Sequence, residues 1–351
     1  MLKIGIVLLP LCLSAVDEGN YFVKVKIGSP SEACVTSLRA ESRRLLIEKM
    51  RTAPGELREV TVAVNVRNSR LTPPPTNAPG GTEVRLNPRE KGSLNWDDEL
   101  SVEFVGEHPC GVVVEKVKAD QLPTVFLAGD STVTDQPRDP NASWGQMFTR
   151  FFGPGVAVAN HAESGETMKS FITGMRLDKM LSYMKKGDYL FLQFGHNDQK
   201  ENWPQTYVEP FTTYKAYLKV FIAEARRRGA TPVLVTSMHR RNFDDQGRIK
   251  NTLGDYPEAM RQVAREENVL LIDLHAMSAK LYEALGPAKS PAMFAGNGRD
   301  ATHHSAYGAY ELAKCVVEGV RASSLDLKRF LTSDVAAFDP SHPDDFETWR
   351  K

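Results

Sequence analysis

Five residues of the kinds used in nucleophilic catalysis occur in four short blocks between residues 129 and 303. The blocks are Gly-Asp-Ser-Thr (129–132), Ser-Gly-Glu (164–166), Gly-His-Asn-Asp (195–198) and Asp-Ala-Thr-His (300–303). They offer a candidate nucleophile, backbone and amide N–H donors, and an Asp–His pair, carried by Ser131, Gly165, Asn197, Asp300 and His303. A serine hydroxyl needs a base to attack a carbonyl, and the resulting anion needs hydrogen-bond donors. Each block alone fits a helix cap or a turn equally well, so the fold must decide.

The segment that carries the blocks, residues 123–325, alternates apolar runs with helical patterns. The apolar runs predict buried strands at 125–128, 156–160, 188–194, 231–236 and 269–273. The helical patterns lie at 144–152, 167–184, 211–228, 256–268 and 305–322. Nearly continuous apolar strands with helical crossovers predict one parallel sheet covered by helices on both faces.

Three of the blocks follow predicted strands, and the fourth precedes the last predicted helix. Loops at the carboxyl ends of parallel strands gather at one edge of the sheet, where α/β enzymes have their active sites. Gly129 permits the tight turn that would place Ser131 at this edge. We therefore predict that the four blocks form a single site.

These blocks, in this order and spacing, resemble the SGNH (GDSL-like) hydrolases over about residues 123–325. The strings Gly-Asp-Ser-Thr-Val-Thr (129–134), Gly-His-Asn-Asp (195–198) and Asp-Ala-Thr-His (300–303) are most similar to the rhamnogalacturonan acetylesterase group. The resemblance implies a flavodoxin-like three-layer α/β/α domain with a five-stranded parallel sheet.

The resemblance also implies a role for each residue. Ser131 would attack an ester carbonyl, His303 would take its proton, and Asp300 would orient the imidazole. The oxyanion hole would consist of the N–H groups of Ser131 and Gly165 and the side-chain amide of Asn197. No metal and no cofactor is expected. His304 competes with His303 as the base, and the Asp-x-x-His spacing favours His303.

The implied activity is removal of O-acetyl groups from a pectic polysaccharide or oligosaccharide, so the expected partner is an acetylated acidic carbohydrate. The stretch His239, Arg240 and Arg241 follows the 231–236 strand, and arginine pairs well with a uronate carboxylate. A surface turn paired with the two following acidic residues explains this stretch equally well. Trp203, close after Asn197, is a candidate for stacking on a sugar ring or for packing.

Two other kinds of function stay open. One is an esterase or lipase acting on another acyl ester, such as acetylxylan, a sialate or a lipid. The polar stretch at 134–139 near Ser131 disfavours a long acyl chain. The other is a non-catalytic carbohydrate-binding protein, which would have no need of a complete Ser, Asp, His, Gly and Asn set.

Residues 17–122 follow a different pattern. Alternating or apolar runs at 21–27, 59–66, 100–105 and 111–117 are separated by turn-rich segments, most clearly 72–81. Short strands joined in this way predict a β-sandwich accessory domain. The stretch 38–49 could instead be a helix. No catalytic group of residues is evident in this domain.

Residues 1–16 have the features of a secretory signal peptide: Lys3, an apolar run at 4–13 and small residues before Asp17. This predicts a secreted or periplasmic protein; the alternative is a buried first strand. Cys12 suggests a lipoprotein, but the bulky Leu11 before it argues against lipid attachment. Cleavage would leave three cysteines too far apart for a disulfide framework, with a single Cys34–Cys110 bridge left open.

The remaining features narrow the class of protein. The chain has 351 residues and a formal net charge of zero, so no nucleic-acid partner is indicated. The apolar run at 4–13 is too short to span a bilayer, so no stable membrane insertion is expected. Residues 326–351 form a C-terminal extension, and the oligomeric state is undetermined.

Overall fold

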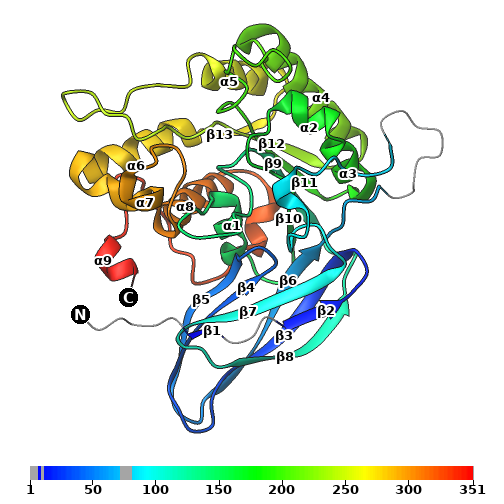
Figure 1. The fold of residues 1–351 in the computed structure, drawn as a ribbon, viewed down its shortest axis with the longest axis vertical. Helices are drawn as coiled ribbons and strands as arrows, with labels where there is room; N and C mark the ends of the chain where they lie inside the picture. The colour runs from blue at the N-terminus through cyan, green and yellow to red at the C-terminus, as the bar shows by residue number, and fades with distance from the viewer. Residues whose placement is uncertain (1–6, 9–11, 72–80, 351) are drawn as a thin grey trace.

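The computed structural model describes residues 7–8, 12–71 and 81–350, without the side chains of residues 7, 8, 12 and 13. The molecule consists of two parts (Figure 1). Antiparallel strands from the N-terminal third form the lower part in that view, and a parallel sheet with its helices forms the upper part. The first part is called the β-domain below and the second the hydrolase-fold domain.

The sheet of the hydrolase-fold domain has five parallel strands in the order β10-β9-β11-β12-β13. Numbered along the domain this order is 2-1-3-4-5, the flavodoxin-like arrangement, so the predicted fold is confirmed. Its switch point lies beside β9, the strand that ends at the Gly-Asp-Ser-Thr turn. The strands are β9 (Thr124–Gly129), β10 (Ala157–Asn160), β11 (Tyr189–Gln193), β12 (Thr231–Val235) and β13 (Leu270–Ile272).

Successive side chains of each strand point to opposite faces of the sheet, so a separate hydrophobic core forms on each face. In β9, Val125 and Leu127 join one core, whereas Phe126 and Ala128 join the other. The first core is covered by α1 (Trp144–Phe148), α6 (Leu274–Lys289) and α8 (Ala306–Ala322). The second is covered by α2 (Met168–Thr173), α3 (Arg176–Tyr183), α4 (Lys215–Arg227) and α5 (Tyr256–Glu266). Shorter helical pieces are η2 (Thr149–Phe151), η3 (Pro210–Tyr214), η4 (Ser290–Met293), α7 (Ala295–Gly298), η5 (Asp326–Phe330) and α9 (Phe346–Trp349).

Some helices differ from the sequence prediction. The predicted helix 167–184 is two helices, separated at Gly174 and Met175, where Met175 adopts φ +62°. The predicted helix 211–228 begins with a π-helical turn. Helix α6 was not predicted at all. It contains Gly286 in a non-helical conformation and Pro287, residues that ordinarily mark the end of a helix.

The β-domain is a sandwich of two antiparallel sheets, as predicted. One contains β7, β4 and β5 with β1 and β2 beside β7; the other has the order β6-β3-β8. Val25, Leu38, Val64 and Phe104 are among the side chains of both sheets that meet in one core. The strands are β1 (Val7–Leu8), β2 (Cys12–Ala15), β3 (Gly19–Gly28), β4 (Cys34–Ala40), β5 (Arg44–Thr52), β6 (Leu57–Val66), β7 (Glu99–His108) and β8 (Gly111–Lys118), with η1 (Pro88–Glu90) before β7.

The helical alternative for residues 38–49 is wrong, because this stretch forms most of the β4–β5 hairpin. The residues of β4 alternate between fully and partly buried, which is the period-two pattern of a strand. Cys34 and Cys110 form a disulfide, and Cys315 is free and buried. The turn-rich segment predicted at 72–81 lies, except for residue 81, outside the described residues.

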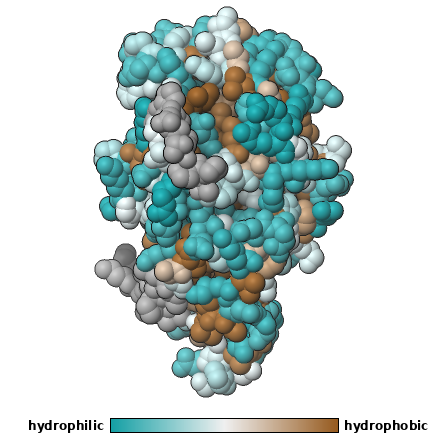
Figure 2. All heavy atoms as spheres, turned by 90° about the vertical axis from the view of Figure 1, so that its right-hand side faces the viewer, coloured by the Kyte–Doolittle hydropathy of each residue, from teal (hydrophilic) through white to brown (hydrophobic). Residues whose placement is uncertain are grey.

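The segment predicted as a signal peptide contributes β1 and β2, whose backbones pair antiparallel with β7. Cleavage after this segment stays a prediction, and it would remove both strands and leave β7, β4 and β5. Among the helices of the described residues, none is long and apolar enough to cross a membrane. Figure 2 shows a largely hydrophilic face with hydrophobic residues in both its upper part and its lower part, which the β-domain forms. The β-domain half exposes Val112, Val114 and Val117.

A buried ion pair joins the two domains. Arg44 of β5 lies 2.6 Å from Asp135 in the hydrolase-fold domain, and both side chains are almost inaccessible to solvent. Asn160 donates to the other Asp135 oxygen over 2.8 Å, and Arg44 donates to the carbonyl of Asn65 over 2.7 Å. Since Asp135 lies four residues after Ser131, the β-domain is anchored next to the candidate nucleophile.

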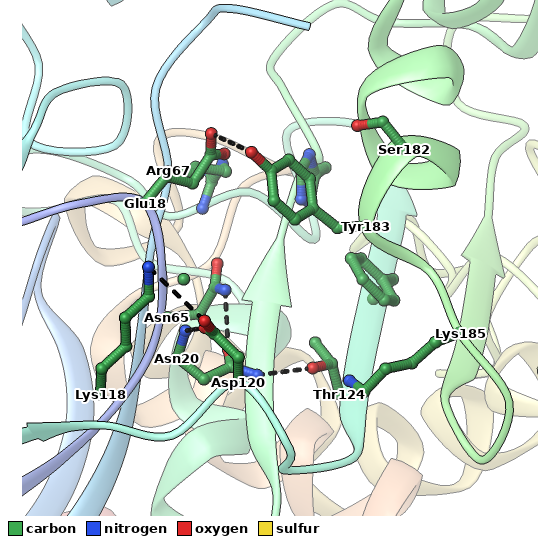
Figure 3. Close-up of a pocket in the computed structure, with 13 residues that line it drawn as sticks. Glu18, Asn20, Asn65, Arg67, Lys118, Asp120, Thr124, Ser182, Tyr183 and Lys185 are labelled. Carbon is green, nitrogen blue, oxygen red and sulfur yellow. Dashed lines mark hydrogen bonds and ion pairs between the residues drawn. The ribbon is translucent and has the colours of Figure 1, made fainter. Parts of the chain in front are cut away.

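A polar cavity of about 390 Å³ lies at the same interface, next to Thr124 at the amino end of β9 (Figure 3). Asn20 donates to the hydroxyl of Thr124 over 2.8 Å, and Asn65 donates to Asn20 over 2.8 Å. Glu18 and Tyr183 point toward one another across the upper part of the view and lie 2.8 Å apart. At this cavity the two domains therefore contact each other through polar side chains, and each contact between them needs one residue from each domain.

We expect Arg44→Ala to lower the free energy of unfolding by about 3–5 kcal/mol, because it leaves the buried Asp135 carboxylate without its cation. The measurement is the urea midpoint of unfolding. The control is Arg58→Ala, which removes an exposed β-domain pair with Glu56 and is expected to cost under about 1 kcal/mol. Equal midpoints for the two variants would contradict this account of the interface.

Candidate active site

The Gly-Asp-Ser-Thr turn is fixed by close packing and by a buried polar network. A Cβ on Gly129 would lie 2.6 Å from Val133 and 2.8 Å from the carbonyl of Gln193, so only glycine fits there. Asp130 is fully buried and accepts hydrogen bonds from the N–H and hydroxyl of Thr132 over 2.9 and 2.7 Å. Gln193 of β11 donates to the same hydroxyl over 2.6 Å. The turn is thereby held at the carboxyl edge of the sheet.

Ser131, His303 and Asp300 form a continuous chain of contacts. Ser131 Oγ lies 2.9 Å from His303 Nε2, and His303 Nδ1 lies 2.7 Å from Asp300 Oδ2. With the proton on Nδ1, the imidazole donates to Asp300 and accepts from the serine hydroxyl, as a general base requires. These contacts bring the first and the fourth block together, and the catalytic roles of the three residues stay a prediction.

Asp300 is itself held in place by its own loop. Its Oδ1 accepts from the backbone N–H of Thr302 over 2.7 Å and of His303 over 2.9 Å. Partial burial would raise the pKa of Asp300, but the hydrogen bonds from His303 and Thr302 lower it below its usual value. The carboxylate is therefore charged at neutral pH and fixes the orientation of the imidazole.

His304 occupies a different environment. It is buried, and its Nε2 lies 2.8 Å from the hydroxyl of Tyr282. Burial and the neighbouring His303 lower the pKa of His304 to about 3. His304 therefore lies away from the serine hydroxyl, whereas His303 contacts it.

The candidate oxyanion donors lie on the turn after β9 and on the loops after β10 and β11. Within the part of the chain that the structure describes, the N–H groups of Ser131 and Gly165 donate to no protein acceptor. Gly165 adopts φ +85°, a conformation that favours glycine. Asn197 donates one amide hydrogen to the carbonyl of Glu166 over 3.1 Å and accepts from Lys200 over 2.7 Å. The orientation of this amide is thus set, and its second hydrogen is left for a ligand.

Sequence analysis did not identify Arg89, a residue of the β-domain segment that contacts the Gly165 loop. Its guanidinium donates to Glu163 over 2.7 Å and to the carbonyl of Ser164. Glu90, next in sequence, pairs over 2.5 Å with the buried Arg176. No motif marks Arg89, because its partners lie 74 and 75 residues further along the chain.

Several of the residues predicted to contact substrate interact with other residues of the protein. The His239 ring is buried against His275, with centroids 3.7 Å apart. Arg240 donates to the carbonyls of Thr252 and His196 over 3.1 and 3.2 Å, which braces the loop that carries Asn197.

Arg241 donates to the carbonyl of Gly298 over 2.7 Å, and Asp244 pairs with Arg248 instead of with either of these arginines. Trp203 is half exposed, with the Lys200 ammonium 4.8 Å from its ring. Substrate binding by His239, Arg240, Arg241 and Trp203 stays a prediction. The described residues contain no group of His, Cys, Asp or Glu side chains suited to a metal ion.

Comparison with known proteins identifies the family to which this chain is similar. The family model described as the GDSL-like lipase/acylhydrolase family matches residues 127–309, from β9 to the first turn of α8. The chain belongs to this family. It is an esterase, and the resemblance seen in the sequence is confirmed at this level.

Relatives of the esterase show which parts of the chain are shared. A rhamnogalacturonan acetylesterase of Bacillus subtilis is 45% identical over 222 residues, covering 60% of this chain and 94% of the relative. A probable rhamnogalacturonan acetylesterase of the same organism is 40% identical and covers 58% and 94%. A crystal structure of the Bacillus subtilis protein YxiM has a TM-score of 0.57 at 22% identity, over 90% of this chain and 80% of that one. The shared fold therefore extends beyond the hydrolase-fold domain.

Proposed function

We propose that this esterase removes O-acetyl groups from a pectic polysaccharide or oligosaccharide of the rhamnogalacturonan kind. The observation that carries the catalytic part is the chain of contacts from Ser131 through His303 to Asp300, at 2.9 and 2.7 Å. The substrate part is supported by the 45% identity to a rhamnogalacturonan acetylesterase over nearly the whole length of that enzyme.

In the proposed mechanism, Ser131 Oγ attacks the acetyl carbonyl while His303 Nε2 takes the hydroxyl proton. His303 then gives this proton to the departing sugar oxygen, which leaves an acetyl group on Ser131. A water molecule, deprotonated by His303, attacks this ester, and acetate and the free serine result. Throughout, Asp300 stabilises the imidazolium that forms twice in the cycle.

The proposed oxyanion hole uses the donors that have no acceptor within the described protein. The N–H groups of Ser131 and Gly165 and the second Asn197 amide hydrogen would bind the carbonyl oxygen as it becomes negatively charged. Donors fixed before the reaction stabilise this charge without reorganising, and each is typically worth about 10²- to 10³-fold in rate. Arg89 and Arg240 hold the loops that carry Gly165 and Asn197.

We expect acetate release to be fastest from acetylated rhamnogalacturonan when acetylated pectin, xylan and sialic acid substrates are compared at equal acetyl content. The measurement is acetate formed per minute, with base-deacetylated samples of each polymer as controls. A clear preference for acetylxylan or sialate would replace the proposed substrate but keep the mechanism. Release from none of them would contradict the carbohydrate assignment.

We also propose that the protein is exported, because polymers of this kind lie outside the cell that degrades them. The basic start and apolar run before Asp17 support this, and the Cys34–Cys110 disulfide suits an oxidising compartment. The expected result is a mature N-terminus near residue 16 in protein recovered from medium or periplasm, read by mass spectrometry. An intact N-terminal segment on protein confined to the cytoplasm would refute export.

A further inference from the structure

A groove of about 850 Å³ lies between the β-domain and the segment that follows the nucleophile turn. One wall comes from the β4–β5 hairpin, a second from the segment after η1, and a third from residues 137–139. This volume is within the range of ligand sites in proteins. None of the catalytic residues assigned above lines the groove, so it is a separate feature of the molecule.

The groove has a moderate excess of cationic groups although the protein has no net charge, and two of its cations, Arg39 and Arg43, are ion-paired with Glu103 and Asp139. Five of its lining residues are Arg or Lys, and three are acidic. Burial raises the pKa of one of these acids, Glu41, to about 8, so it is neutral at pH 7. Burial and the charge of Arg43 lower the pKa of Arg39, which shows that the cations repel one another. The cationic residues are Arg39, Arg43, Arg89, Lys91 and Arg138.

Two of these cations are available to a ligand. Lys91 and Arg138 are exposed, and neither has an ion pair or hydrogen bond among the described residues. Arg39 lies 4.0 Å from Glu103, its ion-pair partner, and more than half of the Arg89 side chain is exposed. An anion in the groove would therefore gain partners without breaking the contacts that hold the domains together.

Two residues that line the groove, Arg89 and Arg43, connect it to segments of the active site. Arg89 donates to the carbonyl of Ser164, and one of its terminal nitrogens is 3.8 Å from the place a Gly165 Cβ would take. Arg43 donates to the carbonyl of Gln136 over 3.2 Å, and Gln136 donates to the carbonyl of Ser131 over 2.7 Å. A polymer with one residue at Ser131 could thus place neighbouring residues along the groove.

We propose that this groove is a subsite, built largely by the β-domain, that binds the carboxylates of uronate residues adjoining the acetylated sugar. This rests on the proposed function for the identity of the polymer. Arginine offers paired donors that match a carboxylate, and lysine adds a mobile charge. The β-domain then contributes to substrate choice by charge, while the hydrolase-fold domain carries out the reaction.

The test is the double variant Lys91→Glu and Arg138→Glu, with activity measured on an acetylated uronate-containing polymer, on acetylxylan and on 4-nitrophenyl acetate. Each exposed ion pair is worth up to about fivefold, so we expect KM for the uronate polymer to rise roughly tenfold at low salt. The other two substrates should be unaffected. The difference should shrink in about 0.5 M salt, because salt screens exposed charges.

The matched control is Arg227→Glu with Arg265→Glu, the same change in charge on exposed positions of α4 and α5. An unchanged KM for the uronate polymer, or an equal rise for acetylxylan, would overturn the proposal. If the unaltered protein hydrolyses no acetylated polysaccharide, the proposed function fails. The groove is then tested by measuring the binding of polygalacturonate by calorimetry. The double variant should lose this binding, and the control variant should keep it.

Discussion

Ser131→Ala is expected to lower acetate release by roughly 10⁴- to 10⁶-fold, the range seen when a nucleophile is removed from a serine triad. The reason is chemical, since no other hydroxyl contacts His303 Nε2 in the described structure. Folding should be unaffected. Among the described residues, the Ser131 hydroxyl is hydrogen-bonded only to the imidazole. The turn is held by Gly129, by Asp130 and by the Gln136 bond to the Ser131 carbonyl.

The matched control is Ser182→Ala, on α3 at the interdomain cavity, which should keep full activity. The measurement is the initial rate of acetate release, together with the urea midpoint of each variant. A second readout identifies the nucleophile directly: a serine-reactive sulfonyl fluoride should label Ser131, and peptide mass spectrometry locates the modification. Unchanged activity in Ser131→Ala, or labelling at another serine, would refute the mechanism.

The sequence predicted the parallel sheet well because β9, β10, β11 and nearly all of β12 are buried on both faces. A run such as 189–192 must then be almost entirely apolar, and few other structures require that pattern. Helix α6 was not predicted because the polar residues His275 and Ser278 occupy part of its buried face and weaken the apolar repeat. Gly286 and Pro287 ordinarily end a helix, but here the chain bends at Gly286 and continues. The stretch 38–49 was ambiguous because β-bulges in the β4–β5 pair accompany an irregular burial pattern along β5, although β4 alternates regularly.

The part of the candidate site that lies directly after the strands could be predicted from the sequence. Ser131, Gly165 and Asn197 follow strands of one sheet, so the topology alone brings them to one edge. Arg89 was not predictable, because its place beside Ser164 depends on how the β-domain packs on the hydrolase-fold domain. The same holds for the groove, whose three walls are distant in sequence.

The basic stretch at 239–241 is a second case in which the sequence pattern predicted the position of residues but not their contacts. Its position after β12 was correctly expected to be near the sheet edge. Composition could not reveal that Arg240 and Arg241 donate to backbone carbonyls of neighbouring loops. Arginine serves equally well as a ligand for substrate and as a brace for loops, and only the positions of its partners distinguish these uses.

His303→Ala is expected to lower acetate release by roughly 10⁴-fold or more, whereas His304→Ala should change it by less than about tenfold. The two histidines are adjacent, but only His303 contacts both Ser131 and Asp300. His304→Ala should act on stability instead. It leaves the buried Tyr282 hydroxyl without its 2.8 Å partner, at a cost of about 1–3 kcal/mol.

The two effects are separated by measuring the rate per folded molecule and the urea midpoint for both variants. His303→Ala should lose activity with a nearly unchanged midpoint, because His303 is partly exposed and its ring contacts lie within the site. His304→Ala should show the reverse. Loss of activity in His304→Ala at an unchanged midpoint, with His303→Ala still active, would assign the base to His304. The contact between Ser131 and His303 would then have no catalytic meaning.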